Sequence, residues 1–83
     1  MVYNSILDAM GGTPLIRLSH MTDEDSAEIL VKFEGLKVGG SIKTRTAYNM
    51  IKVAEAEGKI TPDTIIVEPT SGNQGIGLAL VGA

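Results

Sequence analysis

The sequence contains no cysteine, no tryptophan and only one histidine, His20. Without cysteine, the chain has no thiol nucleophile, no disulfide bridge and none of the usual cysteine-based zinc sites. A single imidazole is also too little for a histidine-rich metal centre, so we expect no bound metal. The lack of disulfides favours a reducing compartment.

Long hydrophobic runs and an excess of positive charge are absent as well. No apolar run approaches the roughly 20 residues that span a membrane, and the N-terminus lacks a basic segment followed by an apolar signal core. The formal net charge of −3 argues against binding to nucleic acids or to anionic membranes. We therefore expect a cytoplasmic protein without a nucleic-acid or membrane partner.

The chain is short, with 83 residues against about 100–150 in a typical domain. Its 43% of hydrophobic and 20% of charged residues are nevertheless typical of a folded globular chain. A chain of this length buries only a little over ~60% of its unfolded surface, and no disulfide or metal is available to stabilise it. The sequence also stops within an apolar helical pattern. We therefore expect residues 1–83 to be an N-terminal fragment of a larger unit, with no internal domain boundary.

The spacing of apolar residues predicts an α/β chain. A helix is favoured over 42–57, where apolar and small residues recur at helical spacing, Ser41 can cap the start and Gly58 can end the helix. Residues 28–33 and 64–68 read as strands on either side of this helix, which predicts a βαβ unit with parallel strands. Shorter elements are expected at 6–10 (helix), 14–18 (edge strand) and 76–81 (helix).

Eight of the ten glycines fall in three clusters, within 11–12, 35–40 and 72–77. The loops 35–41 and 69–75 each follow a predicted strand and precede a helix, so we expect them to face one crevice. Backbone N–H groups and the helix dipole favour an anion at a helix N-terminus. Neither loop is a P-loop or a dinucleotide-binding fingerprint, because the lysine or the glycines stand at the wrong spacing. We therefore expect an anion site of another kind.

Lys43 follows two glycines and stands at the start of the predicted helix. The helix dipole disfavours an ammonium group there by a few tenths to about 1 kcal/mol, and Arg45 adds a like charge. Both effects favour a neutral amine that can form an imine with a carbonyl compound. Position alone leaves open the alternative of an ordinary solvated lysine.

Three segments carry a resemblance to known proteins: GGTPLIRL (11–18), VGGSIKTR (38–45) and VEPTSGNQGIGLAL (67–80). In this order and spacing they resemble the N-terminal part of the pyridoxal-phosphate enzymes of the tryptophan-synthase-β fold type (fold type II). Cysteine synthase (O-acetylserine sulfhydrylase) and cystathionine β-synthase are the most similar branches. The resemblance implies the truncated N-terminal part of a three-layer α/β fold with a parallel sheet. It also implies pyridoxal 5′-phosphate as cofactor, and a homodimer.

The resemblance also implies roles for single residues. Lys43 matches the lysine that binds the cofactor as an imine and then acts as the proton-transfer base. Asn73 matches the asparagine that meets the cofactor's ring hydroxyl. For Thr70 and Ser71 ordinary helix capping is the alternative, and Arg45 is expected to have a surface or structural role. The residues implied to bind the α-carboxylate of an amino-acid substrate are Thr70, Ser71, Gly72, Asn73 and Gln74.

The implied reaction is β-replacement, in which sulfide displaces the acetoxy group of O-acetylserine to give cysteine. The alternatives are a cystathionine β-synthase-like activity and a cysteine β-lyase activity that forms hydrogen sulfide. Gln74 stands where cysteine synthases usually have threonine, so its amide either holds the α-carboxylate or crowds the β-substituent. Because the resemblance assigns the cofactor's phosphate loop to positions beyond residue 83, we expect the chain alone to be inactive. The alternative from another class is a non-catalytic module that binds an anion or a partner through the same loops.

Overall fold

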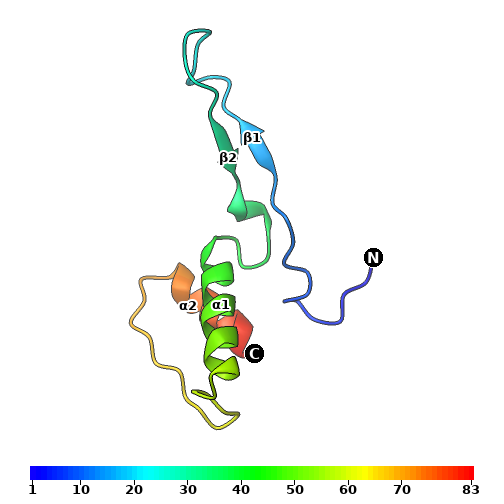
Figure 1. Cartoon of the computed structure of the whole chain (residues 1–83), viewed down its shortest axis with the longest axis vertical. Helices are drawn as coiled ribbons and strands as arrows, with labels where there is room; N and C mark the ends of the chain where they lie inside the picture. The colour runs from blue at the N-terminus through cyan, green and yellow to red at the C-terminus, as the bar shows by residue number, and fades with distance from the viewer.

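The computed structural model describes residues 1–83, the whole chain. It contains, in order, β1 (Leu15–Arg17), β2 (Leu30–Lys32), the 3₁₀ helix η1 (Glu34–Leu36), α1 (Lys43–Ala56) and α2 (Asn73–Gly82). Figure 1 shows that the molecule has two parts. The helices α1 and α2 form a pair, and the β1–β2 ribbon projects from one end of this pair. The chain is therefore elongated, with principal extents of 56 × 34 × 22 Å.

The ribbon is antiparallel, with the register Leu15↔Lys32, Ile16↔Val31 and Arg17↔Leu30. Its pairing is extended at both ends by backbone hydrogen bonds from Leu18 N–H to Ile29 O (3.0 Å) and from Phe33 N–H to Pro14 O (3.1 Å). Pro14 fits at this position because only its carbonyl is used. Both strands predicted in this part of the chain are confirmed, and each is the partner of the other.

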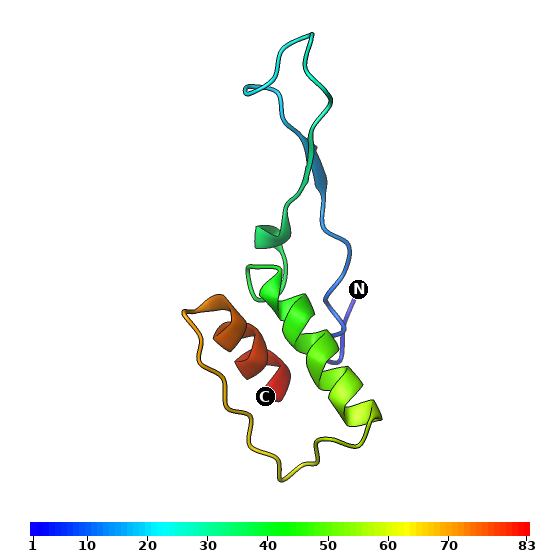
Figure 2. The ribbon, with the colours of Figure 1, turned by 60° about the vertical axis from the view of Figure 1, so that its left-hand side comes forward.

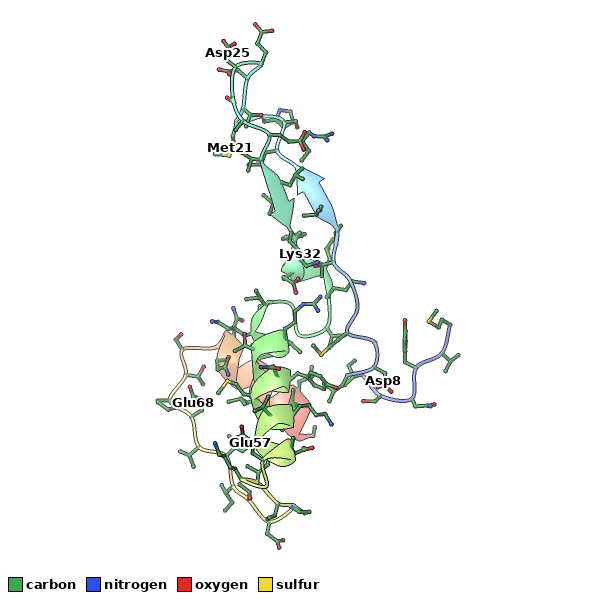
Figure 3. The ribbon with its side chains drawn as sticks, viewed as in Figure 1. Asp8, Met21, Asp25, Lys32, Glu57 and Glu68 are labelled. Carbon is green, nitrogen blue, oxygen red and sulfur yellow. The ribbon has the colours of Figure 1, made fainter.

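The predicted parallel βαβ unit is wrong. Residues 64–68 are extended but pair with no strand, and Ile65 and Val67 are each 85% exposed. The reason is that α1 continues away from β2 instead of folding back along it. The segment that returns from α1 therefore runs beside the helices, far from the ribbon. In Figure 3 Asp25 marks the tip of the ribbon and Glu68 marks this returning segment.

The short helix predicted over 6–10 is also wrong. The N–H groups of Asp8, Ala9 and Met10 bond to the carbonyls three residues earlier at 3.1–3.2 Å, which makes a run of turns rather than an α-helix. Five residues before a glycine pair form too few hydrogen bonds to offset the cost of helix nucleation.

The long helix α1 forms where the sequence predicts it. The Ser41 hydroxyl accepts a hydrogen bond from the N–H of Lys43 at 3.1 Å, as an N-terminal cap does. At the other end Gly58 has φ +71° and donates to Glu55 O at 3.0 Å, while Lys59 N–H donates to Ala54 O at 2.9 Å. This pair of bonds is a Schellman motif, which a glycine accommodates without strain.

Helix α2 begins at Asn73, three residues before the predicted start. The Thr70 hydroxyl accepts hydrogen bonds from the N–H groups of Gly72 (3.1 Å) and Gly75 (3.0 Å). Two N–H groups that would otherwise lack partners are thus satisfied, so the helix can start earlier. Position 75 inside the helix requires glycine, because a Cβ atom there would come within 2.6 Å of Thr70 Cγ2.

The core is small and lies between α1 and α2. Only three of the 83 residues are buried: Thr44, Ala47 and Gly77. A Cβ atom on Gly77 would lie 2.8 Å from the carbonyl oxygen of Lys43 and 3.2 Å from the Cβ atom of Ala47. No side chain therefore separates the helices at this point. The backbone of α2 rests directly on the first turns of α1.

Candidate functional site

The two helices have their N-termini at the same end of the pair, which Figure 1 and the turned view of Figure 2 both show. Lys43 is the first residue of α1, and Asn73 is the first residue of α2. Gly77 contacts the backbone of Lys43 and lies one helical turn, about 6 Å, below Asn73. The predicted cofactor lysine and the predicted substrate loop therefore lie at the same end of the helix pair. The packing of α1 against α2 brings them together. We had expected a pair of parallel strands to do so.

The Lys43 backbone is held on two sides while its side chain is free. Its N–H donates to Ser41, and its carbonyl lies against Gly77. The residue is exposed, and its amine takes part in none of the ion pairs of the chain. An amine on a fixed backbone, without a carboxylate beside it, is available to react with a carbonyl compound.

The loop before α2 offers hydrogen-bond donors to an anion. Thr70 acts as a cap, as the alternative interpretation of this threonine proposed, but its own hydroxyl hydrogen is still available to donate. The N–H groups of Ser71, Asn73 and Gln74 have no partner within the chain. Ser71 and Asn73 are exposed. These donors and the positive end of the α2 dipole suit a carboxylate.

Gln74 is directed toward α1. Its amide Nε2 lies 3.7 Å from the sulfur of Met50, which stands two turns after Lys43 on α1. The sequence left open whether this side chain holds the α-carboxylate or crowds the β-substituent. In the structure the amide packs along the helix pair, and its role toward a substrate stays a prediction.

Two glycines shape the loop that leads to Lys43. Gly39 and Gly40 have φ values of +82° and +72°, which side-chain-bearing residues rarely adopt. A Cβ atom on Gly39 would lie 1.8 Å from the hydroxyl oxygen of Thr44. The loop therefore crosses directly over the first turn of α1. Thr44 is 2% exposed and its hydroxyl has no hydrogen-bond partner in the chain.

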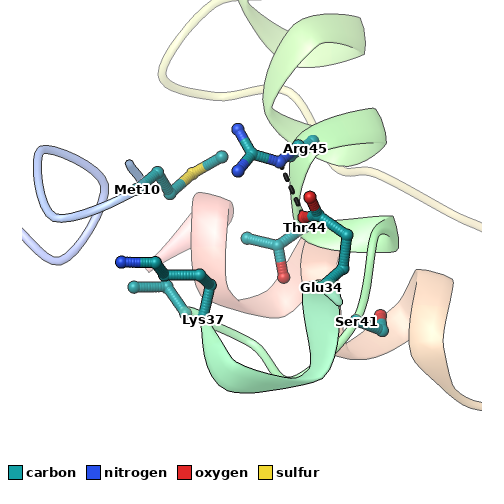
Figure 4. A pocket seen from close by; sticks show the side chains of 7 residues that line it. Met10, Glu34, Lys37, Ser41, Thr44 and Arg45 are labelled. Atoms are coloured by element: carbon teal, nitrogen blue, oxygen red, sulfur yellow. Dashed lines mark hydrogen bonds and ion pairs between the residues drawn. The ribbon is translucent and has the colours of Figure 1, made fainter. Parts of the chain in front are cut away.

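Four residues from distant parts of the chain meet beside this loop, and we call them the Glu34 cluster: Gly11, Thr13, Glu34 and Arg45. Arg45 Nε donates to Glu34 Oε2 at 2.7 Å, and Arg45 Nη2 donates to the carbonyl oxygen of Gly11. The Thr13 hydroxyl donates to Glu34 Oε1 at 2.6 Å. Figure 4 shows the Arg45–Glu34 pair with Thr44 beside it. Sequence reasoning missed this cluster apart from the structural role expected for Arg45.

The cluster changes the local electrostatics. The Thr13 hydroxyl and then Arg45 stabilise the charged carboxylate and hold the pKa of Glu34 below its ordinary value of 4.5. In return, Glu34 compensates the charge of Arg45, so Arg45 adds less positive charge near Lys43 than the sequence suggested. The Glu34 side chain is only 12% exposed.

No group of three or more potential metal-ligating side chains gathers anywhere in the chain. No helix is long and apolar enough to cross a membrane.

Comparison with known proteins identifies the class. Residues 6–83 match the family described as "Pyridoxal-phosphate dependent enzyme", and the chain belongs to this family. A cysteine synthase of Staphylococcus aureus (strain Mu50 / ATCC 700699) is 51% identical over 78 residues, which are 94% of this chain and 25% of that protein. The cofactor predicted from the sequence is the one that gives the family its name.

Two solved structures match almost the whole chain. The O-acetylserine dependent cystathionine beta-synthase from Helicobacter pylori superposes with a TM-score of 0.86 at 40% identity, over 98% of this chain and 27% of that one. A hydrogen sulfide-producing enzyme from Fusobacterium nucleatum gives a TM-score of 0.83 at 48% identity, over 98% and 26%. The predicted α/β fold class, that of fold type II pyridoxal-phosphate enzymes, is therefore confirmed. The chain spans about a quarter of the length of these relatives.

Proposed function

We propose that residues 1–83 form the N-terminal part of the catalytic unit of a cysteine-synthase-type enzyme. Its reaction is β-replacement, in which O-acetylserine and hydrogen sulfide give cysteine and acetic acid. The observation that carries the proposal is the common end of α1 and α2, where an unpaired amine and unpartnered N–H groups lie together. The proposal extends to a cytoplasmic location, which the composition led us to expect, and to a homodimer, which the sequence resemblance implies.

Pyridoxal phosphate fits this end of the helix pair through two side chains. The Lys43 amine is exposed and unpaired, so it can bind the aldehyde carbon of the cofactor. The exposed Asn73 amide stands at the start of the neighbouring helix, where it can hydrogen-bond the ring hydroxyl. When bound, the cofactor supplies an electron sink for the bonds at the substrate's α-carbon.

The residues of this chain orient the substrate and move a proton. The N–H groups of Ser71, Asn73 and Gln74 bind the α-carboxylate, with Thr70 holding the loop in shape through its two caps. Lys43 Nζ accepts the substrate's α-proton once the amine is released, because its backbone keeps it at the same end as the loop.

A second activity is favoured by one specific observation. A structure that is 48% identical to this chain is described as a hydrogen sulfide-producing enzyme. Cysteine would then be the substrate that loses its β-substituent. The contact between Gln74 and Met50 supports O-acetylserine instead, because an amide held against α1 leaves space for a larger β-substituent beside the loop.

The experiment that separates the two activities compares kcat/KM for O-acetylserine, serine and cysteine in the full-length protein. We expect O-acetylserine to be preferred by at least about tenfold, which corresponds to about 1.4 kcal/mol of transition-state binding. Gln74→Thr should change kcat/KM for O-acetylserine by less than about threefold, because the Gln74 amide is held against Met50 on α1. A preference for cysteine would replace the first activity with the second.

A further inference from the structure

The Glu34 cluster joins segments that are far apart in the sequence. Its three hydrogen bonds span 34 residues from Arg45 to Gly11, 21 from Thr13 to Glu34 and 11 from Arg45 to Glu34. The N-terminal segment, η1 and the first turn of α1 are thereby fixed to one another. Lys32 of β2 adds to this network, because its Nζ donates to Thr13 O at 3.2 Å and lies 4.0 Å from Glu34 Oε1.

Arg45 stands two residues after Lys43 on the same helix. Two residues correspond to about 200° of rotation around an α-helix, so the two side chains leave α1 on nearly opposite sides. A bond network that fixes Arg45 therefore fixes the rotation of the first turn of α1 about its axis. The direction in which Lys43 leaves the helix is set by that rotation.

The loop between η1 and α1 is short and tightly constrained, so it cannot absorb a movement of η1 relative to α1. Residues 37–42 connect the end of η1 to the start of α1, and Gly40 N–H donates to Lys37 O at 2.9 Å within the loop. Gly39 lies against Thr44 without space for a Cβ atom. If Glu34 released Arg45, the loop and the first turn of α1 would be free to move together.

We propose that Glu34 and Arg45 are positioning residues for Lys43, which hold its amine in the direction that the cofactor and the substrate's α-proton require. The inference rests on the proposed role of Lys43. It assigns the pair a function in the reaction and not only in folding. A displacement of about 1 Å at a reacting group can cost about a hundredfold in rate, so loss of the cluster should be visible in kcat.

The chain offers a matched control for this inference. Arg17 and Glu28 form the same type of pair at 3.4 Å on the ribbon, but their side chains are 68% and 58% exposed. No hydrogen bond or ion pair joins either residue to α1 or to the loops before the helices. Glu28→Gln therefore makes the same chemical change as Glu34→Gln without touching the Lys43 loop.

The experiment uses the full-length protein and measures four quantities for wild type, Glu34→Gln and Glu28→Gln. These are the amount of pyridoxal phosphate trapped on Lys43 by borohydride, the pH midpoint of the visible band of the lysine-bound cofactor, kcat and KM. We expect Glu34→Gln to lower kcat by about ten- to a hundredfold with KM within about threefold, and to shift the pH midpoint. Glu28→Gln should match wild type in all four.

Each result decides the question. If Glu34→Gln matched Glu28→Gln in kcat and in the pH midpoint, the positioning role would be wrong while the proposed function stood. If wild-type protein were not trapped on Lys43, the proposed function itself would fail. Should Glu34→Gln not fold, Arg45→Lys decides alone, because it keeps a cation beside Glu34 but loses the fork that also reaches Gly11. We then expect an intermediate loss in kcat, and an unchanged kcat would overturn the inference.

Discussion

The two helix N-termini at the candidate site are built in opposite ways. The start of α1 is anchored from a distance, because the Glu34 cluster ties Arg45 to residues 11 to 34 positions away in the sequence. The start of α2 is held locally, by one hydroxyl that caps two N–H groups within five residues of it. The first arrangement suits a lysine that must keep a fixed direction, and the second suits a loop that adjusts to a ligand.

The largest effect expected from this difference concerns the lysine itself. In the full-length protein, Lys43→Ala should abolish the visible band of the bound cofactor and β-replacement, because no other amine stands at the fixed start of α1. Lys37→Ala removes the same charge from an exposed position earlier in the same loop and should leave the band in place. Absorbance spectra of the two variants, recorded after adding pyridoxal phosphate, check this. An intact band in Lys43→Ala would contradict it.

The next largest effect tests how tightly the first loop is held. Gly39→Ala would combine a φ of +82° with an overlap against the Thr44 hydroxyl, and should lower the free energy of unfolding by about 2–5 kcal/mol. Gly40→Ala has a similar φ but open space, so about 1–2 kcal/mol is expected. Urea unfolding of the full-length variants measures both. Equal losses would show that the loop does not press on α1.

A smaller effect compares the two caps directly. Thr70→Val removes the acceptor of two N–H groups and should cost about 1–2 kcal/mol of stability. Ser41→Ala removes the acceptor of one N–H group at a helix start that Arg45 also anchors, so about 0.5 kcal/mol is expected. Both values come from the same unfolding titration. A larger loss for Ser41→Ala than for Thr70→Val would mean that the first helix start depends on local bonds after all.

The smallest effect is a pH dependence that only the distant anchor should produce. The pKa of Glu34 is held below 4.5, so its stabilising contribution is complete above this value and is lost as the pH falls through the lowered pKa. Arg45 and Lys32, the latter at 4.0 Å, are the cations that lose their partner. Between pH 6 and pH 3, the midpoint temperature of thermal unfolding should therefore fall more steeply for wild type than for Glu34→Gln. Parallel curves would exclude a charged Glu34 as the anchor.

The sequence predicts α1 well because its signals are local. Ser41 and Gly58 stand next to the residues whose backbone groups they satisfy, and the structure uses both as predicted. The start of α2 is predicted less well, since Gly75 and Gly77 resemble turn signals. Both lie inside the helix, where Thr70 and the backbone of Lys43 leave no space for a side chain and so require glycine.

Strand pairing and the Glu34 cluster are not predictable from local pattern. Residues 64–68 have the β-branched composition of a strand, but which strand they pair with depends on the direction that α1 takes after the loop. Likewise, nothing near Glu34 in the sequence marks Arg45 or Thr13 as its partners. The position of Lys43 beside the loop before α2 was predicted, although helix packing produces it and not a shared sheet.

The most direct test of the account is the location of the trapped cofactor. Full-length protein is incubated with pyridoxal phosphate, reduced with borohydride and digested, and the modified peptide is identified by mass spectrometry. We predict modification of Lys43 in the peptide that begins the long helix, and its loss when an amino-acid substrate is added before reduction. Modification of Lys37, Lys52 or any other lysine in place of Lys43 would contradict it.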